Sequence, residues 1–179
     1  MAYPKPITRT LLSEEQLATR IDALAADIAR DYAGKDLLLV AVLKGSVVFL
    51  ADLMRALSRY EMPVHIDFMV VSSYGTDTVS SGTVQIKLDL KVDIRDRNLL
   101  LVEDIIDSGL TLNYLRRLLA TRAPASVEVC ALLNKPARNK IDIAARYVGF
   151  DIPDEFVVGY GLDYAEDYRE LPFVGIAEA

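Results

Sequence analysis

The chain has 179 residues and a net charge of -6, and 52% of its residues are hydrophobic. That length and apolar content favour one folded domain over a disordered chain. One histidine and one cysteine exclude a zinc cluster and an internal disulfide framework, and the acidic balance disfavours broad nucleic-acid binding. The sequence shows no pattern of a signal peptide or a membrane helix. We expect a soluble, cytoplasmic protein whose metal, if it uses one, is a hard ion held by carboxylates.

The first predicted element is an amphipathic helix. Ser13 and Gln16 have the spacing of a capping box, and apolar residues follow at helical intervals until Gly34, a typical stop signal.

Two strand–helix–strand units follow this helix. Residues 37–43 are apolar throughout, as expected of a strand buried on both faces of a parallel sheet. The remaining predicted segments are a turn at 44–46, a helix at 47–57, strands at 64–71, 99–102 and 127–133, a turn at 103–109 and a helix at 110–120. Two such units in succession predict an α/β fold with a mainly parallel sheet flanked by helices.

Two other segments have a different character. Residues 72–83 are rich in serine, threonine and glycine, and a connection this long is usually a lid, a binding loop or disordered. From the residues alone, this segment is interpreted equally well as a plain hairpin tip or as a functional lid. After residue 133, proline and glycine interrupt short apolar stretches, which predicts a small, irregular, β-rich subdomain.

The segment LLLVEDIIDSGLTL at 99–112 carries most of the chemical information. In parallel sheets ligands bind beyond the carboxyl ends of the strands, and the free N–H groups of a helix start can hold a phosphate. Capping of the helix explains one acidic residue but not three. Neither GxxxxGK[ST] nor GxGxxG occurs in the chain. The polar residues of the predicted turn are Glu103, Asp104, Asp107, Ser108, Gly109 and Thr111.

Carboxylates beside a phosphate site predict a particular kind of ligand. They repel a phosphate unless Mg²⁺ lies between them or they face another part of the ligand. A substrate with a phosphate at one end and ribose hydroxyls further along meets both conditions.

VEDIIDSGLTL resembles the phosphoribosyl diphosphate motif of the type I phosphoribosyltransferases, most closely that of the hypoxanthine(-guanine) members. The resemblance implies one phosphoribosyltransferase domain over 1–179, with a hood formed by the N-terminal segment and residues about 134–179. Four further motifs occur in family order: LKGS (43–46) resembles the diphosphate loop, SSY (72–74) the start of the mobile catalytic loop, and LLNKPAR (132–138) and IPDEFVVGYGLDY (152–164) the purine-binding hood.

The resemblance implies transfer of a phosphoribosyl group from 5-phosphoribosyl 1-diphosphate to N9 of hypoxanthine and guanine. The products are IMP or GMP and diphosphate, in purine salvage, and the family usually forms homodimers or homotetramers. Two alternatives stay open: a regulatory protein on the same fold that senses phosphoribosyl diphosphate, and a transferase for another nucleobase. The acidic charge disfavours the first, and the hood motifs disfavour the second.

The family pattern also implies a role for individual residues. For phosphoribosyl diphosphate, it implies that the diphosphate is bound by Lys44, Gly45 and Arg169. The ribose hydroxyls would be bound by Glu103 and Asp104, and the 5′-phosphate by Ser108, Gly109 and Thr111. The implied cofactor is Mg²⁺, with Glu103, Asp104 and Asp163 as its carboxylates.

At the purine, the pattern implies that Asp107 is the general acid/base at N7. Lys135 faces O6, Phe156 stacks on the ring and the Val157 carbonyl accepts from N1–H. Ser73 and Tyr74 begin the catalytic lid. The peptide between Leu43 and Lys44 is often cis in this family.

Overall fold

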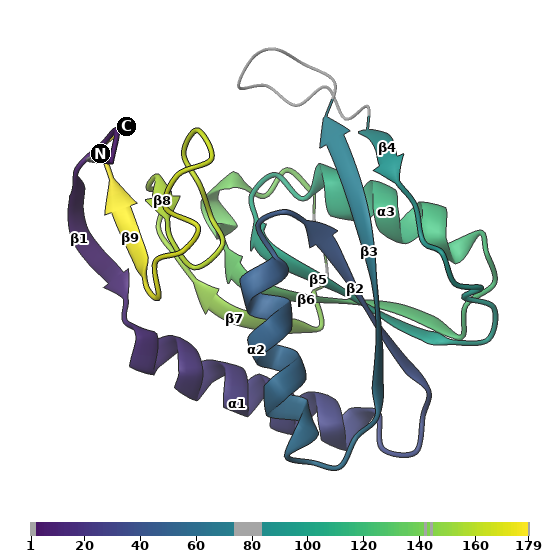
Figure 1. The fold of residues 1–179 in the computed structure, drawn as a ribbon. Coiled ribbons are helices and arrows are strands. Elements are labelled where there is room, and N and C mark those ends of the chain that lie inside the picture. The colour runs from purple at the N-terminus through teal and green to yellow at the C-terminus, as the bar shows by residue number, and fades with distance from the viewer. Residues whose placement is uncertain (1–2, 74–83, 142, 144, 179) are drawn as a thin grey trace.

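The computed structural model describes residues 3–73, 84–141, 143 and 145–178. Within them, six strands form the main sheet in the order β4-β3-β2-β5-β6-β7, and every neighbouring pair is parallel except β3 and β4 (Figure 1). The α/β fold with a mainly parallel sheet is therefore confirmed. The strands are β2 (Leu37–Leu43), β3 (Val64–Ser73), β4 (Val84–Leu88), β5 (Asn98–Ile106), β6 (Ser126–Asn134) and β7 (Tyr147–Asp151).

In the part of the chain that the structure describes, three α-helices cover the two faces of this sheet: α1 (Glu14–Asp31), α2 (Val47–Ser58) and α3 (Leu110–Ala120). The predicted capping box is present, because Ser13 Oγ accepts from the Gln16 N–H at 3.2 Å and Gln16 Oε1 accepts from the Ser13 N–H at 2.8 Å. The helix ends at Asp31, three residues before Gly34.

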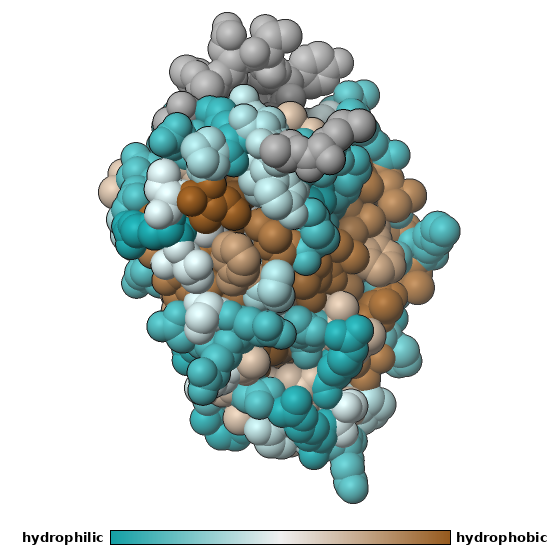
Figure 2. All heavy atoms as spheres, turned by 60° about the vertical axis from the view of Figure 1, so that its left-hand side comes forward, coloured by the Kyte–Doolittle hydropathy of each residue, from teal (hydrophilic) through white to brown (hydrophobic). Residues whose placement is uncertain are grey.

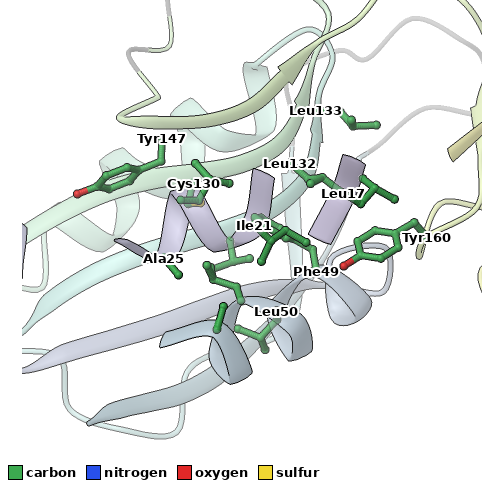
Figure 3. Packing of buried hydrophobic residues seen from close by; sticks show 14 of the residues in the cluster. Leu17, Ile21, Ala25, Phe49, Leu50, Cys130, Leu132, Leu133, Tyr147 and Tyr160 are labelled. Atoms are coloured by element: carbon green, nitrogen blue, oxygen red, sulfur yellow. The ribbon is translucent and has the colours of Figure 1, made fainter. Parts of the chain in front are cut away.

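The core lies on both sides of β2, as its unbroken apolar sequence predicts. Leu39 packs in the cluster that α1 and α2 form with one face of the sheet, and Leu38 packs with α3 on the other. Alternate side chains of a strand point to opposite faces, so a strand between two helical layers must be apolar throughout. In Figure 3, side chains of α1 and α2 point toward those of β6, including Leu17, Ile21, Phe49, Leu50, Cys130 and Leu132.

Strand β5 is longer than predicted and carries two of the acidic residues. The sequence predicts a strand at 99–102 and a turn from 103, but pairing with β6 continues through Ile106, opposite Asn134. The predicted turn is wrong at this end because a continuous ladder tolerates polar side chains at its exit. Glu103 and Asp104 therefore stand on a strand, where backbone pairing holds them.

A second, three-stranded sheet brings the two ends of the chain together (Figure 1). It consists of β1 (Ile7–Leu12), β9 (Val174–Ala177) and β8 (Val157–Val158), which pair antiparallel. Of the residues after 133, β7 belongs to the main sheet and the three-residue 3-10 helix Pro136–Arg138 follows β6. No helix in the described part of the chain is long and apolar enough to cross a membrane.

Some large apolar side chains stay at the surface. Figure 2 shows a face on which apolar residues gather across the middle, bordered by hydrophilic ones. Exposed hydrophobic side chains include Val47 of α2, 42% exposed, and Phe156 just before β8, 39% exposed.

Candidate active site

A cleft of about 310 Å³ opens at the carboxyl ends of β2 and β5, the edge where parallel sheets bind ligands. Its walls come from the turn after β2, the end of β5, the start of α3 and the loop before β9. It brings together residues that lie up to 127 positions apart, from Val42 to Arg169. The predicted site residues that line it are Lys44, Gly45, Glu103, Asp104, Asp107, Ser108, Gly109, Thr111, Asp163 and Arg169.

Two glycines let three backbone segments meet in the cleft. A Cβ on Gly45 would lie 1.6 Å from Asp104 Oδ2, so only glycine leaves room for that carboxylate. A Cβ on Gly161, whose φ is +97°, would lie 2.0 Å from the Gly45 carbonyl oxygen. The turn after β2 is therefore pressed between the end of β5 and the loop after β8. The peptide between Leu43 and Lys44 is cis.

The two adjacent acids of β5 are poorly solvated. Glu103 Oε2 is enclosed and has no hydrogen-bond partner among the described residues. Burial and the neighbouring Asp104 carboxylate raise the pKa of Glu103 well above its usual range, and burial raises the pKa of Asp104 to about 6. Two desolvated carboxylates at the end of one strand favour a hydroxyl-rich or cationic ligand, which would restore the lost solvation.

The start of α3 has the form of a phosphate cradle. Gly109 is the N-cap residue, with φ of 78°, and the Leu110 N–H donates to Ser108 Oγ at 3.4 Å. A Cβ on Gly109 would come within 2.6 Å of Ile143 Cδ1. No acidic side chain occupies the first turn of α3, so the positive end of its dipole is available to an anion.

Two cations face the acids across the cleft, and an unpredicted residue lies between them. Arg169 Nη2 is 2.8 Å from Asp163 Oδ1, and Arg169 Nη1 donates to the Gly161 carbonyl at 2.7 Å. Glu166 Oε2 is 2.8 Å from Lys44 Nζ, and Glu166 Oε1 is 3.6 Å from Arg169 Nη2. Lys44 lowers the pKa of Glu166, so this carboxylate stays charged at neutral pH.

The predicted purine residues lie outside this cleft, in the part of the chain that follows β6. Lys135 is 9% exposed, and its backbone N–H donates to the Ile106 carbonyl at 2.9 Å, which fixes it beside the acidic segment. The Phe156 ring meets Tyr164 edge to face, with centroids 5.7 Å apart. Val157 is buried in β8.

The start of the predicted lid is described only in part. Ser73 ends β3, where it pairs with Val84, and Val71 of the same strand lines the cleft. Tyr74 lies outside the described residues. The role of both residues in a lid stays a prediction.

Two further charged residues were missed by the sequence reasoning. Arg138 Nε lies 2.5 Å from Asp107 Oδ1, and Arg138 Nη1 lies 3.5 Å from Asp154 Oδ1. Asp154 Oδ1 is in turn 3.8 Å from Lys135 Nζ. Arg138 lies in the hood motif LLNKPAR and Asp154 in the hood motif IPDEF. Their place in these motifs was the sequence feature that could have identified them as site residues.

Comparison with known proteins agrees with the fold. The model of the phosphoribosyl transferase domain family matches residues 8–165, and the chain belongs to that family. Its mainly parallel sheet, with acidic residues at the end of the central strand β5, places it in the type I class of these proteins.

Named relatives narrow the class further. The chain is 50% identical to a hypoxanthine-guanine phosphoribosyltransferase from Mycobacterium avium, over 97% of this chain and 87% of that protein. It is 48% identical to the protein of that name from Bacillus subtilis, over 95% and 93% of the two chains. A crystal structure of a hypoxanthine-guanine phosphoribosyltransferase from Bacillus anthracis is 49% identical in sequence and superimposes with a TM-score of 0.91. The match covers 96% of this chain and 99% of the Bacillus anthracis chain.

Proposed function

We propose that the chain transfers the phosphoribosyl group of 5-phosphoribosyl 1-diphosphate to N9 of hypoxanthine and guanine, forming IMP or GMP and diphosphate for purine salvage. One observation supports this most directly. One cleft is surrounded by the desolvated acids of β5, the start of α3 and the two cations Lys44 and Arg169. This arrangement matches a ligand whose hydroxyls are flanked by a phosphate and a diphosphate.

The two phosphate groups of this substrate have separate candidate sites. The N–H groups at the start of α3, with Ser108, Gly109 and Thr111, hold the 5′-phosphate in this proposal. Lys44, the Gly45 backbone and Arg169 hold the diphosphate, whose negative charge grows as the bond to the sugar breaks. Glu103 and Asp104 accept hydrogen bonds from the ribose hydroxyls.

The carboxylates fit Mg²⁺, which we propose as the cofactor. The described residues contain no cluster of three or more side chains able to enclose a metal ion by themselves. Mg²⁺ keeps several waters and usually binds through one or two carboxylates plus substrate phosphates, so the unpartnered Glu103 oxygen, with Asp104 and Asp163, suits it. When bound, the ion neutralises charge on the diphosphate.

The base is chosen by Lys135 in this proposal. A nearly buried ammonium hydrogen-bonds the O6 of hypoxanthine or guanine, but it meets the amino group of adenine donor to donor. Phe156 stacks on the purine and the Val157 carbonyl accepts from N1–H.

In this proposal Asp107 accepts the proton that the purine loses from N7 during the reaction. The N9 lone pair of the N7–H purine bonds to C1′ of the sugar, while the electrons of the C1′–O bond leave with diphosphate. The N7 proton passes to the Asp107 carboxylate as positive charge develops on the ring. Ser73 and Tyr74 begin a lid that keeps water from the sugar during this step.

We further propose how the chain is organised and where it works. Residues 1–179 form one transferase domain, with a hood built from the N-terminal segment and residues about 134–179. Exposed apolar surface such as that in Figure 2 suits contact between copies in a homodimer or homotetramer. A single cysteine is consistent with a cytoplasmic location.

A direct assay tests the reaction. The protein is mixed with Mg²⁺, phosphoribosyl diphosphate and one of hypoxanthine, guanine, xanthine or adenine, and nucleotide and diphosphate are measured. We expect IMP and GMP and no AMP. No product with hypoxanthine or guanine would refute the proposal.

A further inference from the structure

We propose that Arg138 is a positioning residue that holds the Asp107 carboxylate toward the purine. The inference rests on the proposed function, which gives Asp107 the N7 proton. Arg138 Nε lies 2.5 Å from Asp107 Oδ1, an enclosed oxygen, so the two side chains form an ion pair. With Oδ1 held by the guanidinium, the other carboxylate oxygen is left to accept from N7–H.

The backbone around Arg138 gives the guanidinium a fixed base. The Lys135 N–H donates to the Ile106 carbonyl at 2.9 Å, and the Lys140 N–H donates to the Ser108 carbonyl at 3.1 Å. These two bonds attach the segment that carries Arg138 to both sides of Asp107. The Arg138 N–H also donates to the Lys135 carbonyl at 3.0 Å, closing the short 3-10 turn.

Arg138 also connects the two groups that the purine would contact at different edges. Its Nη1 lies 3.5 Å from Asp154 Oδ1, and the same oxygen lies 3.8 Å from Lys135 Nζ. The charges alternate in the order Asp107, Arg138, Asp154, Lys135. The N7 acceptor and the O6 donor are therefore oriented by one set of ion pairs. The planar guanidinium has five donors in a fixed arrangement, which suits it to contact two carboxylates at once.

A role in overall stability does not explain the pair. The side chains of Arg138 and Asp107 are 45% and 47% exposed, and ion pairs this exposed contribute little to stability. In a site that a purine covers, the same pair is removed from water and becomes stronger. Its effect should therefore be seen in turnover.

The test compares Arg138→Ala, Arg138→Lys, Asp107→Asn and the double variant Arg138→Ala/Asp107→Asn. Arg122→Ala is the matched control, because Arg122 pairs with Asp89 at 2.7 Å and Asp89 is 44% exposed, away from the cleft. We expect Arg138→Ala to lower kcat on the order of 10- to 100-fold, with the KM for phosphoribosyl diphosphate unchanged. Arg138→Lys should recover part of the loss, and Arg122→Ala should match the unmodified protein.

Two readouts separate positioning from other roles. The double variant should be no slower than Asp107→Asn, because residues that act through one another are not additive. The affinity gap between hypoxanthine and 7-deazahypoxanthine, which has carbon in place of N7, should shrink in Arg138→Ala.

Two results would overturn the inference: losses that multiply in the double variant, or Arg138→Ala kinetics equal to those of Arg122→Ala. Either would leave the proposed function intact if the unmodified protein makes IMP. Failure of the unmodified protein to make IMP would refute the proposed function instead.

Discussion

Glu166 Oε2 lies 2.8 Å from Lys44 Nζ, so a carboxylate of the chain is paired with a cation proposed to hold diphosphate. Diphosphate must displace this carboxylate or share the cation with it. We expect Glu166→Gln to tighten inhibition by diphosphate about fivefold, equivalent to about 1 kcal/mol. The measurement is the inhibition constant of diphosphate in the forward reaction.

Asp167→Asn is the control for this prediction, because it removes the same charge from the same exposed loop. Both residues of the Lys44–Glu166 pair are 66% exposed, so Glu166→Gln should leave the melting temperature nearly unchanged. Equal inhibition constants in the two variants would contradict the prediction.

The space at Gly45 predicts a sharp effect of one methyl group. In Gly45→Ala the new Cβ would have to displace the Asp104 carboxylate, because an ideally placed Cβ at residue 45 lies 1.6 Å from Asp104 Oδ2. We expect kcat/KM for phosphoribosyl diphosphate to fall on the order of 100-fold, because both the turn and the ribose-facing acid move. Initial-rate kinetics measure this loss.

Gly34→Ala is the matched control, because its Cβ would meet nothing within 4 Å, although the φ of +71° is strained for alanine. It should cost about 1 kcal/mol of stability and leave kcat/KM unchanged. Gly45→Ala kinetics that resemble those of Gly34→Ala would show that the cleft tolerates the methyl group.

The raised pKa of Asp104 predicts a pH-dependent stability. Because burial raises it to about 6, this group favours the folded protein below its ordinary pKa of 3.8 and loses that contribution as the pH rises through about 6. The loss is on the order of 3 kcal/mol at most. In metal-free buffer, the free energy of unfolding of the unmodified protein, relative to that of Asp104→Asn, should fall between pH 4 and pH 7. The fall follows from the rise of about two units in the pKa of Asp104.

Thermal or urea unfolding at a series of pH values measures this difference. Taking the difference from Asp104→Asn cancels groups with the opposite dependence, such as Asp36, whose pKa Arg97 lowers. Parallel curves for the two proteins would show that Asp104 is solvated in solution.

Lys135 should determine which purines react. Lys135→Ala is expected to lower kcat/KM for hypoxanthine on the order of 100-fold, because O6 loses its donor in a nearly buried place. Lys140→Ala is the control, an exposed lysine of the same segment. Hypoxanthine kinetics that are the same in both variants would refute the O6 assignment.

The capping box, the buried strand β2 and the helices α2 and α3 could be predicted from local patterns. Each depends on residues that are neighbours in sequence, so spacing and burial carry the information. The end of β5 could not be predicted, because Glu103 and Asp104 remain in a strand through pairing with β6, about 28 positions along the chain. Strand β1 was missed for the same reason, since it forms by pairing with β9 at the other end.

The order of motifs by itself determined the fold class, the family and most of the residues that line the cleft, because strand–turn–helix segments keep their functional groups at the strand ends. Only the tertiary structure decided which charges neutralise each other there. It placed Glu166 between Lys44 and Arg169, and Arg138 beside Asp107. Ion pairs depend on distances of a few ångströms between side chains, and the linear order of residues does not contain those distances.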